Sequence, residues 1–231
     1  MQKLLFIIIC STMLLACKKQ DDVTVSFTIK TTNKTPNNRP YQLSVAKTKI
    51  LFSNFVYVDK DNNEVLVKDV FLLTSAVNNF QFKFPGGNFT KFKFSFGLDS
   101  IKNNSVPASF LASSPLSVET GLYWDMLKYR FLILEGNIDN SVTKNQTPNT
   151  PFSMHLGSDT LYQQIVASNF PKIGEQLNIT LDLDKLFVLD NDNFQITNFS
   201  NHSEASEIAK GIAIRNSFVN SIQTTITPKA K

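Results

Sequence analysis

Cysteine is nearly missing from this chain of 231 residues: its two cysteines, Cys10 and Cys17, both lie close to the N-terminus. The segment from residue 18 onward can therefore form no disulfide and offers no thiolate to a metal. A metal site there would need histidine, carboxylate, methionine or modified side chains. A chain of this length can bury a stable core without cross-links.

Several function classes lack their signatures as well. The formal charge is only +4, and Lys and Arg alternate with Asp and Glu, so no basic block indicates a nucleic-acid partner. Of the two histidines, His155 and His202, neither lies in a nucleophile-elbow or zinc-protease motif. No glycine-rich loop is present to hold a phosphate. We expect neither nucleic-acid binding nor enzyme activity.

The N-terminus has the features of an export signal. Lys3 precedes an apolar run, 4–13, which is too short to span a membrane and fits the hydrophobic region of a signal peptide. The next residues, Leu14-Leu15-Ala16-Cys17, resemble the bacterial lipobox, in which the cysteine is acylated. A plain secretory signal with an accidental cysteine is the alternative.

The lipobox predicts the organisation of the chain. We expect residues 1–16 to be a lipoprotein signal peptide, and residues 17–22, with their charged Lys18 to Asp22 stretch, to be a lipidated tether. Residues 23–231 then form one domain. Lipid on Cys17 would anchor it to a membrane of the bacterial cell envelope, as in surface lipoproteins of Bacteroidetes.

Period-two alternation of apolar and polar residues predicts an all-β fold. It is clear in 23–29, 80–84, 92–96 and 179–183, whereas 50–58, 65–73 and 129–134 are more apolar and look like central strands. Segment 59–63 is predicted to be a turn, and Pro85-Gly86-Gly87-Asn88 a hairpin between the two Phe-rich strands. We expect one antiparallel β-sandwich.

The C-terminal segment has helical spacing instead. Asn201 and Glu204 resemble a capping box, which predicts a helix over about 202–222 packed on the sandwich. The expected packing stripe leaves out Ile214 and Phe218 and consists of Ala205, Ile208, Ala209, Ile212, Asn216 and Val219.

Three side chains are candidates for a site. On a strand, His155 would point away from the face shared by Phe152, Met154 and Leu156. His202 lies at the predicted helix start, where the helix dipole disfavours imidazolium, and neutral imidazole is the form that binds metals. Trp124, the only tryptophan, lies where an irregular segment enters a long strand. Taken singly, each is more often a surface histidine or a core tryptophan.

Four pieces of the sequence together resemble the MbnP-like family of extracytoplasmic copper-binding proteins. They match the family's "Y-x-S-N", "F-x-L-G-V-D", "G-M-Y-W-x-W-x-x-G-Y … E-G" and "F-H-L-G" patterns in order along the chain. A weaker fifth match is the terminal helix, with His202-Ser203 and Asn216-Ser217-Phe218. The four pieces are Lys49 to Phe55, Phe94 to Asp99, Gly121 to Gly136, and Met154 to Asp159.

The resemblance implies a copper site. In the best-understood relatives a tryptophan is oxidised to kynurenine by a partner di-haem enzyme, and this side chain and histidines hold copper. Carried over, Trp124 would be the modified residue and His155 and His202 the imidazole ligands, with Met126 as a weaker thioether ligand.

Two family positions differ here: Met126 replaces the second Trp of W-x-W, and Lys128 replaces the Gly before Tyr. The alternative is a metal-free surface lipoprotein that binds a protein or a glycan.

Overall fold

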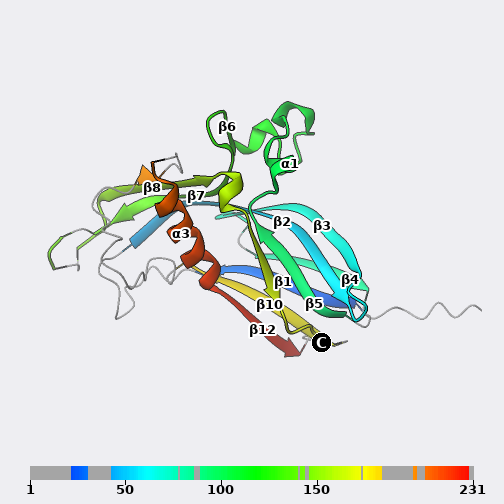
Figure 1. The fold of residues 1–231 in the computed structure, drawn as a ribbon. Coiled ribbons are helices and arrows are strands. Elements are labelled where there is room, and N and C mark those ends of the chain that lie inside the picture. Colours follow the sequence, from blue (N-terminus) through cyan, green and yellow to red (C-terminus); the bar gives the residue numbers. More distant parts are fainter. Residues whose placement is uncertain are drawn as a thin grey trace, which may run out of the picture.

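The alternating segments form strands in the computed structural model, which describes residues 22–30, 43–77, 79–85, 89–139, 141–143, 146–172, 174–183, 200–201 and 206–228. Two sheets face each other as a β-sandwich, as the sequence predicts (Figure 1). The described part of the chain contains no helix that is both long and apolar enough to cross a membrane.

The smaller sheet has four strands in the order β12-β10-β1-β4. Its centre is β1 (Asp22–Lys30), which pairs antiparallel with β4 (Asn79–Pro85) and parallel with β10 (Glu175–Asp182). The edge strand β12 (Ile222–Pro228) pairs antiparallel with β10 and was not foreseen from the sequence.

The larger sheet is built around β2 (Leu43–Asp59). Along one of its edges, the N-terminal part of β2 pairs with β7 (Lys128–Ile138) and its C-terminal part pairs with β5 (Phe89–Phe96). Strand β3 (Glu64–Thr74) also pairs with β2. Beyond these lie β9 (Gln163–Ala167) next to β5, β6 (Tyr123–Trp124) and β8 (Thr150–Gly157) next to β7, and β11 (Ser200–Asn201) next to β8.

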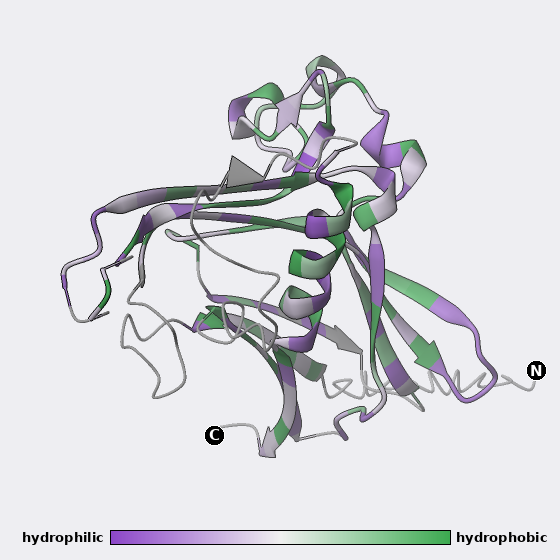
Figure 2. Ribbon diagram, turned by 60° about the vertical axis from the view of Figure 1, so that its left-hand side comes forward, coloured by the Kyte–Doolittle hydropathy of each residue, from purple (hydrophilic) through white to green (hydrophobic). Residues whose placement is uncertain are grey.

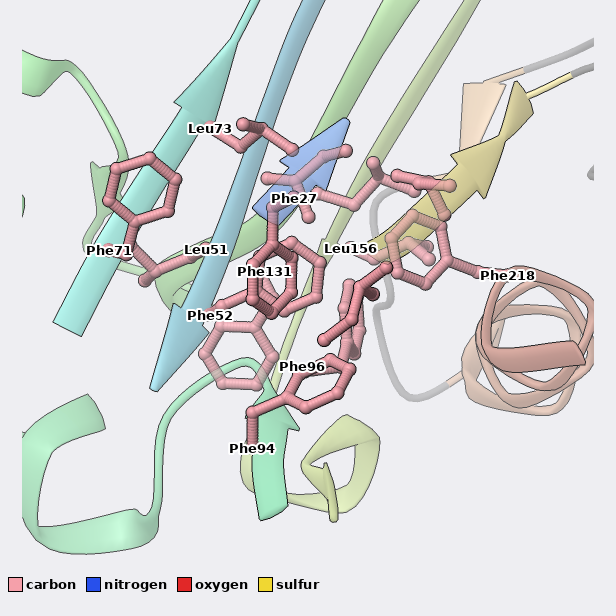
Figure 3. Packing of buried hydrophobic residues seen from close by; sticks show 14 of the residues in the cluster. Phe27, Leu51, Phe52, Phe71, Leu73, Phe94, Phe96, Phe131, Leu156 and Phe218 are labelled. Atoms are coloured by element: carbon pink, nitrogen blue, oxygen red, sulfur yellow. The ribbon is translucent and has the colours of Figure 1, made fainter. Parts of the chain in front are cut away.

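Phenylalanine rings fill the space between the sheets (Figure 3). Phe27 of β1 lies 5.1 Å from Phe94 of β5 and 5.4 Å from Phe55 of β2, measured between ring centroids. Both pairs are edge-to-face, the arrangement that aromatic quadrupoles favour. The heavy use of one aromatic therefore serves the core.

The segment after β5 leaves the sandwich as an irregular excursion, residues 100–127 (Figure 1). It contains α1 (Ser100–Asn103), the 3₁₀ helices η1 (Pro107–Ser109) and η2 (Val118–Thr120), and β6. Its departure point is Gly97, whose φ of 78° suits glycine, and a Cβ there would overlap the Phe131 ring. The buried Ser53 hydroxyl donates to the Gly97 carbonyl at 2.6 Å.

The predicted hairpin at Pro85 is wrong. The strand before it, β4, belongs to the smaller sheet, and the strand after it, β5, belongs to the larger one. The Pro-Gly-Gly-Asn segment therefore links two sheets, because turn-forming residues fix a change of direction but not the pairing partner. The predicted turn at 59–63 is confirmed: Asp59 Oδ1 accepts hydrogen bonds from the backbone of Asp61 and Asn63.

The C-terminal helix is present but shorter than predicted. Helix α3 covers Ile208–Asn220 and lies beside the sandwich, between β8 and β12 in Figure 1. Asn201 is no N-cap, because it belongs to β11, and residue 207 occupies the cap position without a side-chain hydrogen bond. The predicted stripe is partly confirmed, because Ile208, Ile212 and Val219 are half-buried and pack against the core. Ala209 and Asn216 are exposed instead, and Ala205 lies outside the described residues. The most deeply buried residues of the helix are Gly211, Ile214 and Phe218.

Candidate functional site

His155 occupies the outer face of β8, as its strand parity predicts. Phe152, Met154 and Leu156 are buried toward the core, whereas His155 and Ser153 point the other way. The His155 side chain is nonetheless only 14% exposed. It is held in a polar, partly shielded position.

Glu135 is a hydrogen-bond partner of His155. Its Oε1 lies 2.8 Å from His155 Nε2, and Ser153 Oγ lies 3.1 Å from the same nitrogen. Glu135 is opposite Ser153 in the β7–β8 ladder and opposite Lys47 in the β2–β7 ladder. The carboxylate thus sits at the centre of three neighbouring strands.

Charge keeps Glu135 ionised. Burial raises the pKa of Glu135, but hydrogen bonds and charges from His155 and Lys47 lower this pKa by more, so it ends below its ordinary value. Lys47 Nζ lies 3.1 and 3.2 Å from the two carboxylate oxygens. At neutral pH the group is therefore a carboxylate that can only accept hydrogen bonds.

Trp124 lies in β6, at the base of a tight hairpin with β7. It pairs with Lys128, and the Leu127 amide donates to the Trp124 carbonyl at 3.0 Å. Met126 is at the tip of this hairpin and is 64% exposed. Arg130 Cζ lies 5.9 Å from the Trp124 ring centroid, within cation–π range.

Lys49 and Arg130 donate hydrogen bonds to the backbone that precedes Trp124. Lys49 Nζ donates to the Thr120 carbonyl at 2.6 Å. Arg130 donates to the carbonyls of Gly121 and Leu122, so its guanidinium joins the excursion to β7. Burial, Lys47 and Arg130 lower the pKa of Lys49, against an opposing effect of Glu135.

The structure places the predicted ligands on neighbouring strands, with different positions along β7. Trp124 pairs with Lys128, and His155 is opposite Ile133. Five residues of strand correspond to about 17 Å. The meeting of the three rings stays a prediction, because His202 lies outside the described residues, as does Cys17.

The chain next to His202 can still be located. Asn201, the residue before it, pairs with Met154, the residue before His155, in the parallel ladder of β11 and β8. Among the described residues, no group of three or more His, Cys, Asp and Glu side chains could hold a metal. The described donor set fits copper in one respect: it offers an imidazole hydrogen-bonded to a carboxylate, as metal-binding histidines commonly are.

Other residues of the matched sequence pieces form a structural network instead. Asn54 Nδ2 lies 3.2 Å from the Tyr162 hydroxyl, and Lys102 Nζ lies 3.1 Å from Asn54 Oδ1. Asn103 donates to Asp159 at 2.7 Å and accepts from the Tyr129 amide at 3.1 Å. These bonds join the excursion to the sandwich and explain those motifs without a metal.

Sequence reasoning missed Lys47 and the role of Glu135. Glu135 was visible in the "E-G" end of the third piece, but its partners come from other strands. Gly136 beside it has its own steric reason, because a Cβ there would overlap the Ser44 carbonyl.

Comparison with known proteins agrees with this fold. The sequence model of the MbnP family matches residues 20–207. The solved structure of MbnP from Methylosinus trichosporium is similar, with a TM-score of 0.51 and 16% identity, over 72% of this chain and 77% of that one. No curated protein sequence matches. At this identity the structural likeness supports the fold alone.

Proposed function

This chain belongs to the MbnP family, and from that premise we propose that it is a lipid-anchored, extracytoplasmic copper-binding protein without enzyme activity. His155 and His202 are the proposed imidazole ligands. Trp124, oxidised to kynurenine by a di-haem partner enzyme, is the further ligand that the family resemblance implies, although its strand position lies about 17 Å from that of His155 along β7. Met126 is the weaker thioether candidate. Cys17 carries the lipid that holds the protein at a membrane of the cell envelope.

The observation that carries this proposal is the position of His155. It lies on the outer face of β8 and shares a hydrogen bond with Glu135, while Asn201 pairs with Met154 one residue earlier in the ladder. Strand β11 therefore brings the chain, as far as Asn201, alongside the residue that precedes His155. Adjacent strands are about 4.8 Å apart, which suits two imidazoles on one metal ion.

Copper content of the purified chain tests the proposal. We expect stoichiometric copper on the wild type and its loss in a His155→Ala, His202→Ala double variant. Gln164→Ala, an exposed change in β9, is the control and should retain the metal. Copper content that is unchanged in the double variant would contradict the proposal. Mass spectrometry of the Trp124 peptide reports separately on kynurenine.

The geometry argues against a hydrolase. Ser153, His155 and Glu135 resemble a Ser-His-carboxylate set by composition only. A relay needs the serine and the carboxylate on opposite ring nitrogens. Here Ser153 Oγ and Glu135 Oε1 both contact Nε2 of His155.

One observation favours a protein-binding module as the second candidate. The excursion, at the top of Figure 2, exposes large apolar side chains at 59–88% of their surface, and such side chains in soluble proteins can mark interaction sites. They are Ile101, Val106, Leu111, Val118 and Met126. Its test is a cell-envelope partner that co-purifies with the wild type and with His155→Ala, and is lost from an Ile101→Ser, Leu111→Ser variant.

A further inference from the structure

The Glu135 carboxylate is fixed from two sides. Lys47 of β2 holds both of its oxygens, at 3.1 and 3.2 Å, and lies directly opposite it in the strand ladder. His155 of β8 approaches Oε1 from the other side at 2.8 Å. Because partners from both neighbouring strands hold it, the carboxylate has little freedom to turn away from the imidazole.

This arrangement determines where the imidazole proton lies. Lys47 donates to both oxygens of Glu135, and such oxygens accept hydrogen bonds, so the 2.8 Å contact of Oε1 with His155 Nε2 places a proton on Nε2. The Ser153 hydroxyl, 3.1 Å from the same nitrogen, can accept from the same N–H. In a neutral imidazole with Nε2 protonated, the lone pair is on Nδ1, whatever hydrogen bond that lone pair accepts.

We propose that Glu135 is a positioning residue that fixes His155 as the Nε2-protonated tautomer and so selects Nδ1 as the nitrogen that binds copper. The inference rests on the proposed function. A carboxylate on the far nitrogen of a ligand histidine orients the ring and makes the ligating nitrogen more basic. Lys47 serves the same end indirectly, because it holds the carboxylate in place.

The first experiment uses the metal-free chain, so that it does not depend on copper. In a His202→Gln background His155 is the only histidine, and long-range proton–nitrogen NMR at about pH 8 identifies the protonated nitrogen of the neutral ring. We expect Nε2–H, and a mixture of both tautomers when Glu135→Ala is added. A proton on Nδ1, or a tautomer unchanged by Glu135→Ala, would overturn the proposal.

The second experiment measures copper(I) affinity against a chromophoric chelator, with His202 restored. Glu135→Ala should weaken binding by about 10–100-fold, the usual effect of removing such a partner. Glu135→Gln should recover part of this loss, because its amide oxygen can still accept from Nε2. The control is Glu64→Ala, which removes an exposed carboxylate paired with Lys93 and should leave affinity unchanged.

The experiments distinguish a failure of the proposed copper function from a failure of the proposed role of Glu135. A wild-type chain that binds no copper contradicts the proposed function, and the metal role of Glu135 with it. Normal copper affinity in Glu135→Ala contradicts only the role of Glu135.

Discussion

Lys128 has a backbone φ of 60°, in the left-handed region, at the end of the β6–β7 turn. A residue with a Cβ loses about 1–2 kcal/mol there, whereas glycine adopts this conformation freely. The resembled family pattern has glycine at this position. We predict that Lys128→Gly raises the free energy of unfolding by about 0.5–1 kcal/mol, after allowing for the greater flexibility of glycine in the unfolded chain.

Urea denaturation of wild type and Lys128→Gly measures this change. Lys91→Gly is the matched control, because Lys91 is an exposed residue inside β5. The same substitution should destabilise there by about 0.5–1 kcal/mol. Equal effects at both positions would show that the positive φ of Lys128 carries no strain.

The direction of a single side chain was predictable where strand geometry alone determines it. The outward direction of His155 follows from strand parity, since neighbouring side chains alternate. Its link to Glu135 does not follow, because β7 and β8 are separated by a long loop in sequence and only their register brings the two side chains together. The value of Met126 as a ligand stays a prediction.

Among the elements, helix α3 is anchored by Phe218, a residue that the predicted packing stripe left out. Phe218 is fully buried, with its ring centroid 4.8 Å from that of Phe96 and 6.2 Å from that of Phe52. We predict that Phe218→Ala lowers the free energy of unfolding by about 3–5 kcal/mol, through lost burial and a cavity. Asn216→Ala, on the exposed face, should change it by less than about 0.5 kcal/mol.

Chemical denaturation of both variants measures this contrast. A larger loss in Asn216→Ala than in Phe218→Ala would restore the face predicted from the sequence.

It was predictable which segments form the helix and most of the strands, but not which elements they pack against or pair with. Helical spacing in the tail gave two overlapping apolar stripes, and the shape of the sandwich surface decides which of their residues pack most deeply. Strand β12 was missed because only Ile222 and Ile226 are apolar in it and it lies at an edge. The turn-forming residues at Pro85 do not indicate that β4 and β5 belong to different sheets.

Helix α1 begins with a charge pair that makes stability depend on pH. Burial raises the pKa of Asp99, but hydrogen bonds from the Lys102 amide and ammonium lower this pKa by more. Burial lowers the pKa of Lys102, but Asp99 and Asp69 raise it by more. The Asp99 contribution is therefore complete above its ordinary pKa of 3.8 and is lost as pH falls through the lower folded value.

Asp99→Asn keeps a capping side chain and removes the charge. We predict that this variant is less stable than wild type at pH 6 and that the difference shrinks below about pH 3.8. The contribution of the Lys102 charge to the free energy of unfolding should disappear only above about pH 10.5. Thermal or urea unfolding across pH measures the difference, with Asp61→Asn in an exposed turn as the control. A difference that is constant from pH 2 to 6 would contradict the assignment.

The whole molecule has an asymmetric layout. Strand β1 begins at Asp22, which pairs with Pro85 at the end of β4, and β5 begins a few residues later at Phe89. The excursion starts beyond the opposite end of β5, about 25 Å away at the usual rise per residue. The first described residue, Asp22, and the excursion that carries Trp124 therefore lie toward opposite ends of β5.

The proposed lipid on Cys17 has a testable consequence. We predict that Cys17→Ser abolishes incorporation of an alkyne fatty acid and releases the protein from the membrane fraction. Cys10→Ser is the matched control, because the proposed cleavage removes Cys10 with the signal, and it should leave labelling intact. Since residues 18–231 contain no cysteine, neither change can break a disulfide of the domain. Labelling that survives Cys17→Ser would favour the plain secretory signal.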